Sequence, residues 1–119
     1  MKLWLDDVRP PPDETWMWVK SAQEALDLFR DKEVTIASLD FNLGGAPSRL
    51  YDWLAPNGGQ LLQAMAVENL GPEEELRIHT DNKRAADQMV LLATQIALHR
   101  PKRFRIVVDD QFKTYLYES

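Results

Sequence analysis

The sequence contains no cysteine, which excludes disulfide bonds, zinc–thiolate sites and a cysteine nucleophile. It also has no run of about 20 apolar residues, the length that a membrane-spanning helix needs. Residues 1–5 lack the long apolar stretch of a secretory signal peptide. We therefore expect a cytoplasmic protein that has no membrane partner.

Basic residues are in the minority. The chain carries 14 Lys and Arg against 19 Asp and Glu, so its formal net charge is −5. A protein that binds duplex DNA or a membrane surface would carry a basic stripe, and neither partner is expected here. A small phosphate ligand held through a metal ion remains compatible with this charge. The 119 residues, of which 45% are hydrophobic, suit one domain over residues 1–119.

Short apolar runs alternate with helical patterns along the chain. Helical spacing follows Ser21, spans residues 60–70 and recurs between Asn82 and Arg100. The apolar runs predict five strands, at residues 3–5, 15–19, 34–39, 76–80 and 104–108. This alternation predicts an α/β fold built as a three-layer, mostly parallel sheet, and residues 112–117 are expected to add a C-terminal strand.

The link between the first two predicted strands is short and contains three prolines, Pro10 to Pro12. Prolines fix φ and remove backbone donors, so this link is not expected to form a helix. Parallel strands normally need a crossover of a dozen or more residues. Either a crossover helix has been lost or the two strands form a hairpin, and the sequence is compatible with both.

Polar side chains stand where several predicted strands end. Asp6 and Asp7 follow the first strand, and Asp40 follows the third. Ligands of open α/β sheets bind at the carboxyl ends of the strands, so the three carboxylates should converge there. Packed carboxylates repel one another unless a cation or protons neutralise them. The sequence therefore predicts a divalent metal site, for Mg²⁺ or Mn²⁺, on Asp6, Asp7 and Asp40.

Other groups should lie near these carboxylates. His79 ends the fourth strand, where it could exchange a proton with a ligand or be a buried histidine bonded to the backbone. Thr80 and Asn82 stand where the next helix begins, a place that suits either phosphate binding or simple N-capping. Arg9 could neutralise the acidic pair or hold a phosphate. Trp53, in the long loop before residue 60, is a candidate contact for a protein partner.

Four blocks of the sequence resemble the cyclic-phosphate processing receiver-like domains. They read LDDVRP at residues 5–10, WVKSAQEA at 18–25, SLDFNLG at 38–44 and IHTDN at 78–82. The resemblance covers about residues 1–95. It implies a receiver/flavodoxin-like five-stranded sheet without the first helix, and a function in processing cyclic phosphate ends. It also implies a site at Asp6, Asp7, Asp40, His79 and Asn82, in which Asp40 matches the phosphoacceptor of ordinary receivers.

The sequence departs from that family at two positions of the third strand end. The family pattern there is Asp-His-Asp-Leu-Gly, whereas this chain has Phe41 and Asn42 in place of the histidine and the second aspartate. If two histidines act as acid and base, one partner is missing. An insertion-like stretch follows at residues 45–56. The fifth strand also lacks a lysine followed by proline, so ordinary phosphorelay signalling is not expected.

Three hypotheses follow. The leading one is a metal-dependent phosphoesterase-like domain acting on a small cyclic phosphate, either a nucleotide or an RNA end. In it, Asp40 and His79 act in catalysis while Arg9, Thr80 and Asn82 hold the phosphate. The second is a catalytically degenerate domain that binds a nucleotide or a protein partner. The third is a receiver that is phosphorylated on Asp40.

Overall fold

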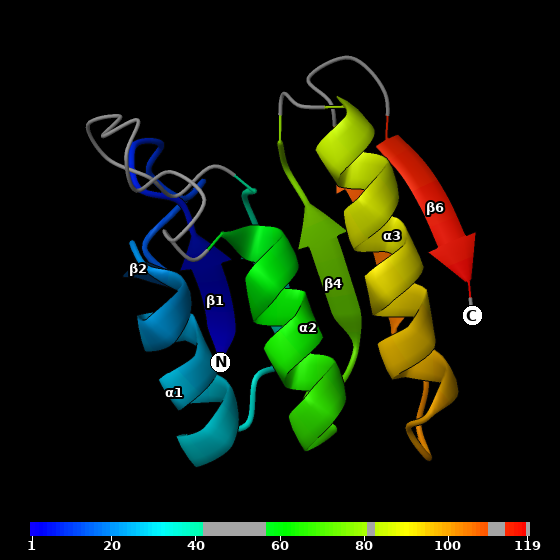
Figure 1. The fold of residues 1–119 in the computed structure, drawn as a ribbon. Coiled ribbons are helices and arrows are strands. Elements are labelled where there is room, and N and C mark those ends of the chain that lie inside the picture. Colours follow the sequence, from blue (N-terminus) through cyan, green and yellow to red (C-terminus); the bar gives the residue numbers. More distant parts are fainter. Residues whose placement is uncertain (42–56, 81–82, 110–113, 119) are drawn as a thin grey trace, which may run out of the picture.

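The fold is known from a computed structural model that describes residues 1–41, 57–80, 83–109 and 114–118. Six strands form one sheet in the order β2-β1-β3-β4-β5-β6 (Figure 1). Their bounds are β1 Lys2–Leu5, β2 Trp16–Val19, β3 Ile36–Leu39, β4 Glu75–Ile78, β5 Arg105–Asp109 and β6 Thr114–Glu118.

Strands β1 to β5 are parallel, and β6 pairs antiparallel with β5. The predicted mostly parallel five-stranded sheet and its additional C-terminal strand are therefore confirmed. The five parallel strands are in register at their carboxyl ends, where Leu5 lies between Val19 and Leu39, and Ile78 lies between Leu39 and Val108. This alignment brings the residues that follow each strand to one edge of the sheet.

The link between β1 and β2 decides between the two alternatives left open by the sequence. The strands are parallel, so they do not form a hairpin. Residues 6–15 contain no helix, so the crossover helix between β1 and β2 is absent. A strand of four residues is about 13 Å long. Ten extended residues reach about 33 Å, so this link can return to the start of β2 without a helix.

The three described helices are α1 Ala22–Asp31, α2 Gly58–Glu68 and α3 Lys83–Leu98. All three lie on one face of the sheet (Figure 1). The connections from β2 to β3, from β3 to β4 and from β4 to β5 all run in the same direction across the sheet. Because such crossovers are right-handed, their helices lie on the same side of the sheet. The step from β1 to β2 runs the other way, so the lost helix would have covered the opposite face. Among the described residues the domain thus has two layers, not the three that were expected.

The hydrophobic core lies between the helices and the sheet. Alternate strand residues face the helices. The buried side chains include Leu3, Leu39 and Ile78 from the strands, together with Met65 from α2 and Met89 from α3. The opposite, helix-free face carries the other half of each strand, including Trp4 and Ser38. No helix of the described residues is long and apolar enough to cross a membrane.

Helix α2 begins earlier than the predicted residue 60. Asn57 is its N-cap and forms a reciprocal capping box with Gln60, and these bonds allow the helix to start at Gly58. Gly58 also packs closely against the end of β3, where an added Cβ would lie 2.2 Å from the backbone oxygen of Asp40. The helix ends before Asn69, which adopts a left-handed φ of 56°. The first turn of α2 is thereby fixed beside Asp40.

Candidate metal and phosphate site

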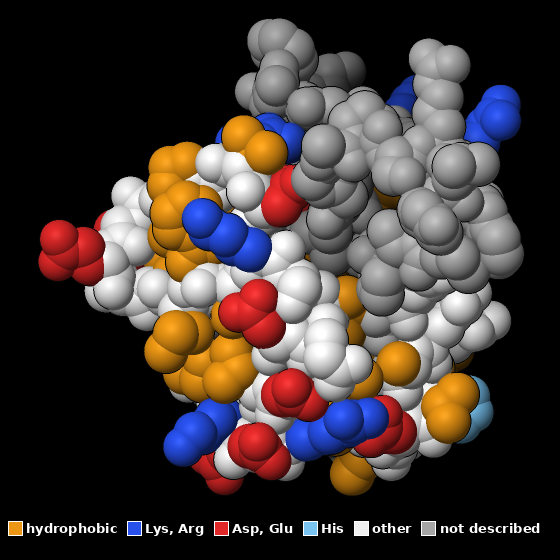
Figure 2. Space-filling view, turned by 60° about the vertical axis from the view of Figure 1, so that its left-hand side comes forward, with side chains coloured by type: hydrophobic (Ala, Val, Ile, Leu, Met, Phe, Trp, Pro, Cys, Tyr) orange, Lys and Arg blue, Asp and Glu red, His pale blue; other side chains and the backbone are white. Residues whose placement is uncertain are grey.

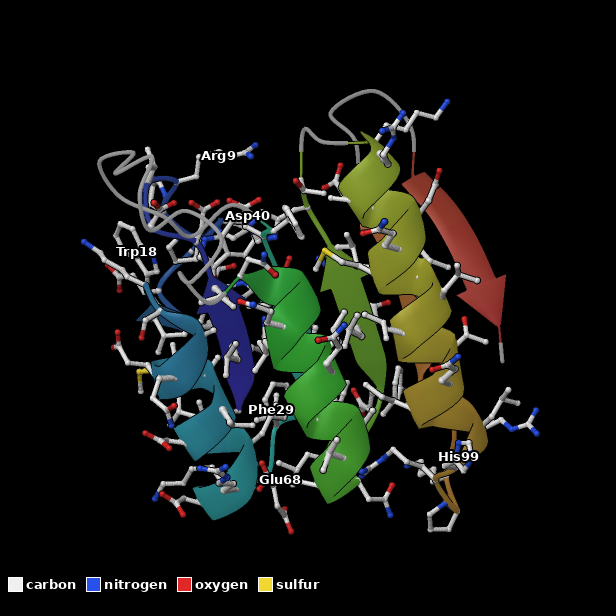
Figure 3. The ribbon with its side chains drawn as sticks, viewed as in Figure 1. Arg9, Trp18, Phe29, Asp40, Glu68 and His99 are labelled. Atoms are coloured by element: carbon white, nitrogen blue, oxygen red, sulfur yellow. The ribbon has the colours of Figure 1, made fainter. Side chains whose placement is uncertain are left out.

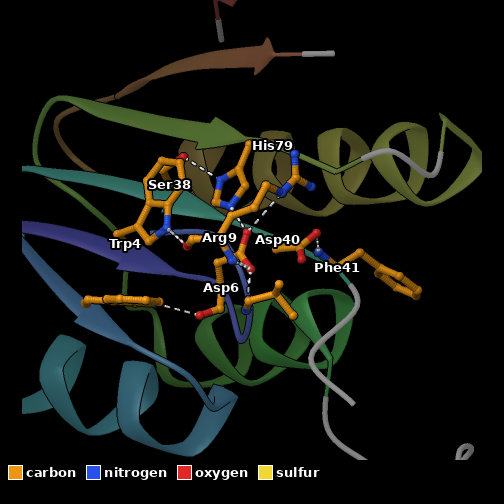
Figure 4. A network of polar contacts seen from close by, with 9 residues as sticks. Trp4, Asp6, Arg9, Ser38, Asp40, Phe41 and His79 are labelled. Carbon is orange, nitrogen blue, oxygen red and sulfur yellow. Dashed lines mark hydrogen bonds and ion pairs between the residues drawn. The ribbon is translucent and has the colours of Figure 1, made fainter. Parts of the chain in front are cut away.

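Three polar residues continue the sheet by one residue beyond its strands. The backbone N–H of Asp6 donates to Val19, that of Asp40 to Leu5, and that of His79 to Leu39. The side chains of Asp6, Asp40 and His79 therefore follow one another across β1, β3 and β4. They lie on the same side of the sheet as Trp4 and Ser38, as Figure 4 shows.

Asp6, Asp7 and Asp40 form a carboxylate cluster at this edge. Each can offer one oxygen, and these oxygens lie within 4.8 Å of one another. Asp6 is 1% exposed and Asp40 is 6% exposed, whereas Asp7 is half-buried. The predicted convergence of the three aspartates is therefore present in the fold. This donor set is all oxygen, which suits Mg²⁺, Mn²⁺ or Ca²⁺ rather than a thiolate-seeking metal.

Asp6 is held by hydrogen bonds on both of its oxygens. Oδ1 accepts from the backbone N–H groups of Val8 and Arg9, each at 2.8 Å. Oδ2 lies 3.1 Å from His79 Nε2 and 3.5 Å from Arg9 Nε. An aspartate side chain that accepts from the N–H groups two and three residues later forms an Asx turn. Here that turn also fixes the direction of the Asp6 carboxylate.

Asp40 has a different environment. Burial, followed by the charge of Asp6, raises its pKa to about 6, while hydrogen bonds from the Phe41 N–H and the Thr80 side chain act in the opposite sense. The Phe41 N–H donates to Oδ1 at 2.8 Å. Two buried carboxylates side by side cannot both ionise easily. The ionised form of Asp40 is therefore disfavoured beside Asp6.

His79 is enclosed by three residues. Its Nδ1 lies 2.7 Å from the Ser38 hydroxyl and its Nε2 lies 3.1 Å from Asp6 Oδ2. The indole of Trp4 stacks on the imidazole, with ring centroids 4.0 Å apart and planes 8° from parallel. Burial lowers the pKa of His79 below its ordinary value, although the hydrogen bond and the charge of Asp6 act against this shift.

Arg9 and Trp18 border the cluster. The Arg9 side chain is 43% exposed and forms the ion pair with Asp6. Trp18 donates from its indole Nε1 to the Asp6 carbonyl oxygen at 2.7 Å. The ammonium of Lys20 lies over the Trp18 ring, 4.7 Å from its centroid, in a cation–π contact. Figure 3 shows Arg9 and Asp40 at the same end of the sheet, whereas Glu68 and His99 lie at the other end.

Residues 1–95 match the model of the cyclic-phosphate processing receiver domain. The chain belongs to this family. The match runs from β1 into α3, so it includes every described residue of the site. Searches of curated proteins and of solved structures returned no match. Membership in the cyclic-phosphate processing receiver family confirms the predicted receiver-like fold.

Most of the predicted site residues lie together in this receiver domain. Asp6, Asp7 and Asp40 form the carboxylate cluster, and Arg9 pairs with Asp6. Two further predicted residues, His79 and Thr80, are buried and contact Asp6 and Asp40 respectively. The other predicted residues, Asn82 and Trp53, lie outside the described residues, and so does Asn42, which departs from the family pattern.

Sequence reasoning missed three neighbours of His79. Ser38 and Trp4 contact its ring, and the charge of Asp109, at the end of β5, acts against the lowering of its pKa by burial. Ser38 could have been found from its position, since it is a polar residue two places before Asp40 and so shares its side of the strand. Asp109 ends a strand that lies in register with β4.

The described surface near β2 and α1 is chemically mixed. Figure 2 shows acidic, basic and hydrophobic side chains interspersed on this side of the molecule. Its exposed hydrophobic residues include Val8, Met17 and Trp18. On the side shown, the basic side chains of the described residues are scattered rather than arranged in a stripe.

Proposed function

We propose that this domain is a metal-dependent phosphoesterase that acts on a small cyclic phosphate, carried by a nucleotide or by an RNA end. The observation that supports this proposal is the carboxylate cluster of Asp6, Asp7 and Asp40 beside the cation of Arg9. An anionic phosphate would be repelled by the carboxylates alone. A cation on the cluster and the Arg9 guanidinium together would make the same edge of the sheet attractive to it.

The three aspartates would hold the cation. The raised pKa of Asp40 supports this assignment, because a divalent ion would replace the proton that relieves the repulsion from Asp6. The hydrogen bonds on Asp6 Oδ1 keep that carboxylate in one orientation. A bound cation would supply Lewis acidity toward a phosphoryl oxygen.

The phosphate would be held by groups at the rim of the cluster. Arg9 offers N–H donors that match phosphate oxygens, and its side chain is 43% exposed. Thr80 lies beside Asp40, and Asn82 follows it in the sequence. His79 also lies beside the cluster. It could exchange a proton with the ligand only if its bond to Asp6 or to Ser38 were broken.

A direct assay tests this proposal. Purified protein is incubated with 2′,3′-cyclic nucleotides and with RNA that ends in a cyclic phosphate, in the presence of Mg²⁺ or Mn²⁺. We expect the cyclic phosphate to open to a monoester, and the rate to fall at least 100-fold in Asp40→Asn. Turnover that persists in Asp40→Asn, or that survives EDTA, would overturn the proposal.

A second candidate is a domain that binds such a ligand, or a protein partner, without turnover. It is favoured by Phe41, which stands where the family has a histidine and packs partly buried against the core. An apolar ring at this position cannot transfer a proton. Metal-dependent binding of a non-hydrolysable nucleotide, with no product under any metal, would support this candidate. Phosphorylation of Asp40 is a separate alternative, which intact mass after incubation with a small phosphodonor would reveal.

A further inference from the structure

The hydrogen bonds of His79 determine which of its nitrogens carries the proton. Asp6 Oδ1 accepts two backbone N–H groups and Oδ2 pairs with the Arg9 guanidinium, so both oxygens act as acceptors, as in an ionised carboxylate. An ionised carboxylate can only accept, so His79 Nε2 must donate to Asp6 Oδ2. In a neutral imidazole the other nitrogen is then an acceptor. The Ser38 hydroxyl, at 2.7 Å, donates to it.

The ring is also fixed in orientation. Trp4 stacks on one face of the imidazole, and Trp4 is itself anchored because its Nε1 donates to the Arg9 carbonyl oxygen at 2.8 Å. His79, Ser38 and Asp6 are each buried, with at most 6% of their surface exposed. A rotation of the imidazole would leave Ser38 or Asp6 without its partner in a buried place, which is costly.

We infer that Ser38 and Trp4 are positioning residues, which fix the His79 ring so that its Nε2–H holds the Asp6 carboxylate in place for a cation. His79 is then a support for a metal ligand rather than a group that exchanges protons with the phosphate ester. This inference rests on the cation site of the proposed function. Such outer partners of metal ligands typically change metal affinity by 10- to 100-fold.

The first test measures the tautomer directly. Long-range ¹H–¹⁵N NMR distinguishes Nε2–H from Nδ1–H imidazole. His79 is expected as Nε2–H, whereas His99, whose Nδ1 donates to the Gln95 carbonyl oxygen at 2.7 Å, is expected as Nδ1–H in the same spectrum. Ser38→Ala keeps the Asp6 contact that sets the tautomer, so His79 should stay Nε2–H in this variant, but its Nδ1 resonance should shift because the hydroxyl donor is lost. A His79 that is Nδ1–H in the wild type, or whose Nδ1 resonance is unchanged in Ser38→Ala, would overturn the inference.

Ser21→Ala is the matched control for Ser38→Ala. Ser21 caps α1, where its side chain accepts from the Glu24 N–H, so its loss should destabilise the fold without touching the site. Ser38→Ala is expected to weaken Mn²⁺ binding about tenfold, measured by the EPR signal of free Mn²⁺, and Ser21→Ala to leave it within twofold. Equal losses in the two variants would mean that Ser38 acts only through stability.

The second test distinguishes two roles of His79, namely holding the Asp6 carboxylate in place and exchanging a proton. A glutamine can donate an amide N–H toward Asp6 and accept from Ser38, but it cannot act as an acid or base near neutral pH. We expect His79→Gln to bind Mn²⁺ at least tenfold more tightly than His79→Ala. His99→Gln is the matched histidine control, and circular dichroism shows which variants fold. Equal Mn²⁺ affinity in His79→Gln and His79→Ala would overturn the inference.

Failure of the inference can be distinguished from failure of the proposed function. Neither the tautomer nor the Mn²⁺ affinity requires turnover. If no cyclic phosphate is hydrolysed but both patterns hold, the proposed reaction fails and the support role of His79 stands. If a cyclic phosphate is hydrolysed and His79→Gln is at least 100-fold slower at saturating Mn²⁺, His79 exchanges a proton and the inference is wrong.

Discussion

Asp6 and Asp40 end the neighbouring parallel strands β1 and β3, and burial together with the charge of Asp6 raises the pKa of Asp40 to about 6. Two results follow for a domain without a bound cation. At neutral pH, which lies above this pKa, the fold contains a buried carboxylate whose ionisation costs stability. A divalent ion removes this penalty, so folding and metal binding should be coupled.

Asp40→Asn should stabilise the metal-free protein at pH 8. The pKa of Asp40 is higher in the fold than the ordinary 3.8, so ionisation of Asp40 costs stability as the pH rises from about 4 through 6. Asparagine avoids that cost and can still accept the Phe41 N–H. After allowance for solvent screening, we expect a gain of about 1–2 kcal/mol at pH 8, which disappears at pH 4.

Thermal unfolding at the two pH values measures this gain. The melting temperature of Asp40→Asn should rise by about 4 to 8 °C at pH 8. Asp31→Asn is the control, since Asp31 is exposed at the end of α1. If Asp40→Asn has the same melting temperature as the wild type at pH 8, the carboxylate repulsion is not a cost in this fold.

Affinity for Mn²⁺ or Mg²⁺ should fall as the pH drops below 6. A proton on Asp40 competes with the cation, because both occupy the same carboxylate. With a pKa of about 6, the affinity should fall about fivefold between pH 6 and 5 and approach a tenfold loss per pH unit only below pH 5. Calorimetric titration at pH 5, 6 and 7.5 measures this dependence. An affinity that is equal at pH 5 and pH 7.5 would remove Asp40 from the set of metal ligands.

The strand-end aspartates were predictable from the sequence because a charge directly after an apolar run marks both the end of a strand and the edge where ligands bind. The direction of β2 was not predictable, since a ten-residue link is compatible with a parallel crossover and with a hairpin. Only the observed pairing with β1 shows that β2 is parallel. The hydrogen bond between Ser38 and His79 joins residues 41 positions apart. No local pattern reports such a contact. The start of α2 was missed because two glycines resemble a loop, although the Asn57–Gln60 capping box outweighs them.

Arg9→Gln should weaken the binding of a cyclic phosphate at saturating metal. The variant removes a cation from the rim of the site but keeps an amide donor. A hydrogen bond to a charged group contributes about 1.5–3 kcal/mol, so KM or Kd should rise about 10- to 100-fold. Arg30→Gln is the matched control, since Arg30 pairs with Glu68 at 2.7 Å, at the far end of the helices. An unchanged KM in Arg9→Gln would exclude Arg9 from phosphate binding.

Gly58→Ala should disturb the site without changing any polar group. Its Cβ would lie 2.2 Å from the Asp40 carbonyl oxygen and 2.9 Å from Met89 Cε, so either α2 or the end of β3 must move. We expect a loss of about 1–3 kcal/mol in unfolding free energy, measured in urea, together with weaker Mn²⁺ binding.

The control is Gly59→Ala, one residue further along α2. There the nearest atoms to an added Cβ are side-chain atoms of Asn57 and Phe41, at 3.2 and 3.3 Å, and alanine favours the helix by about 1 kcal/mol. Its unfolding free energy should therefore stay within about 1 kcal/mol of the wild type. If both alanine variants bind Mn²⁺ as the wild type does, the close packing of α2 against β3 does not position Asp40 for the cation.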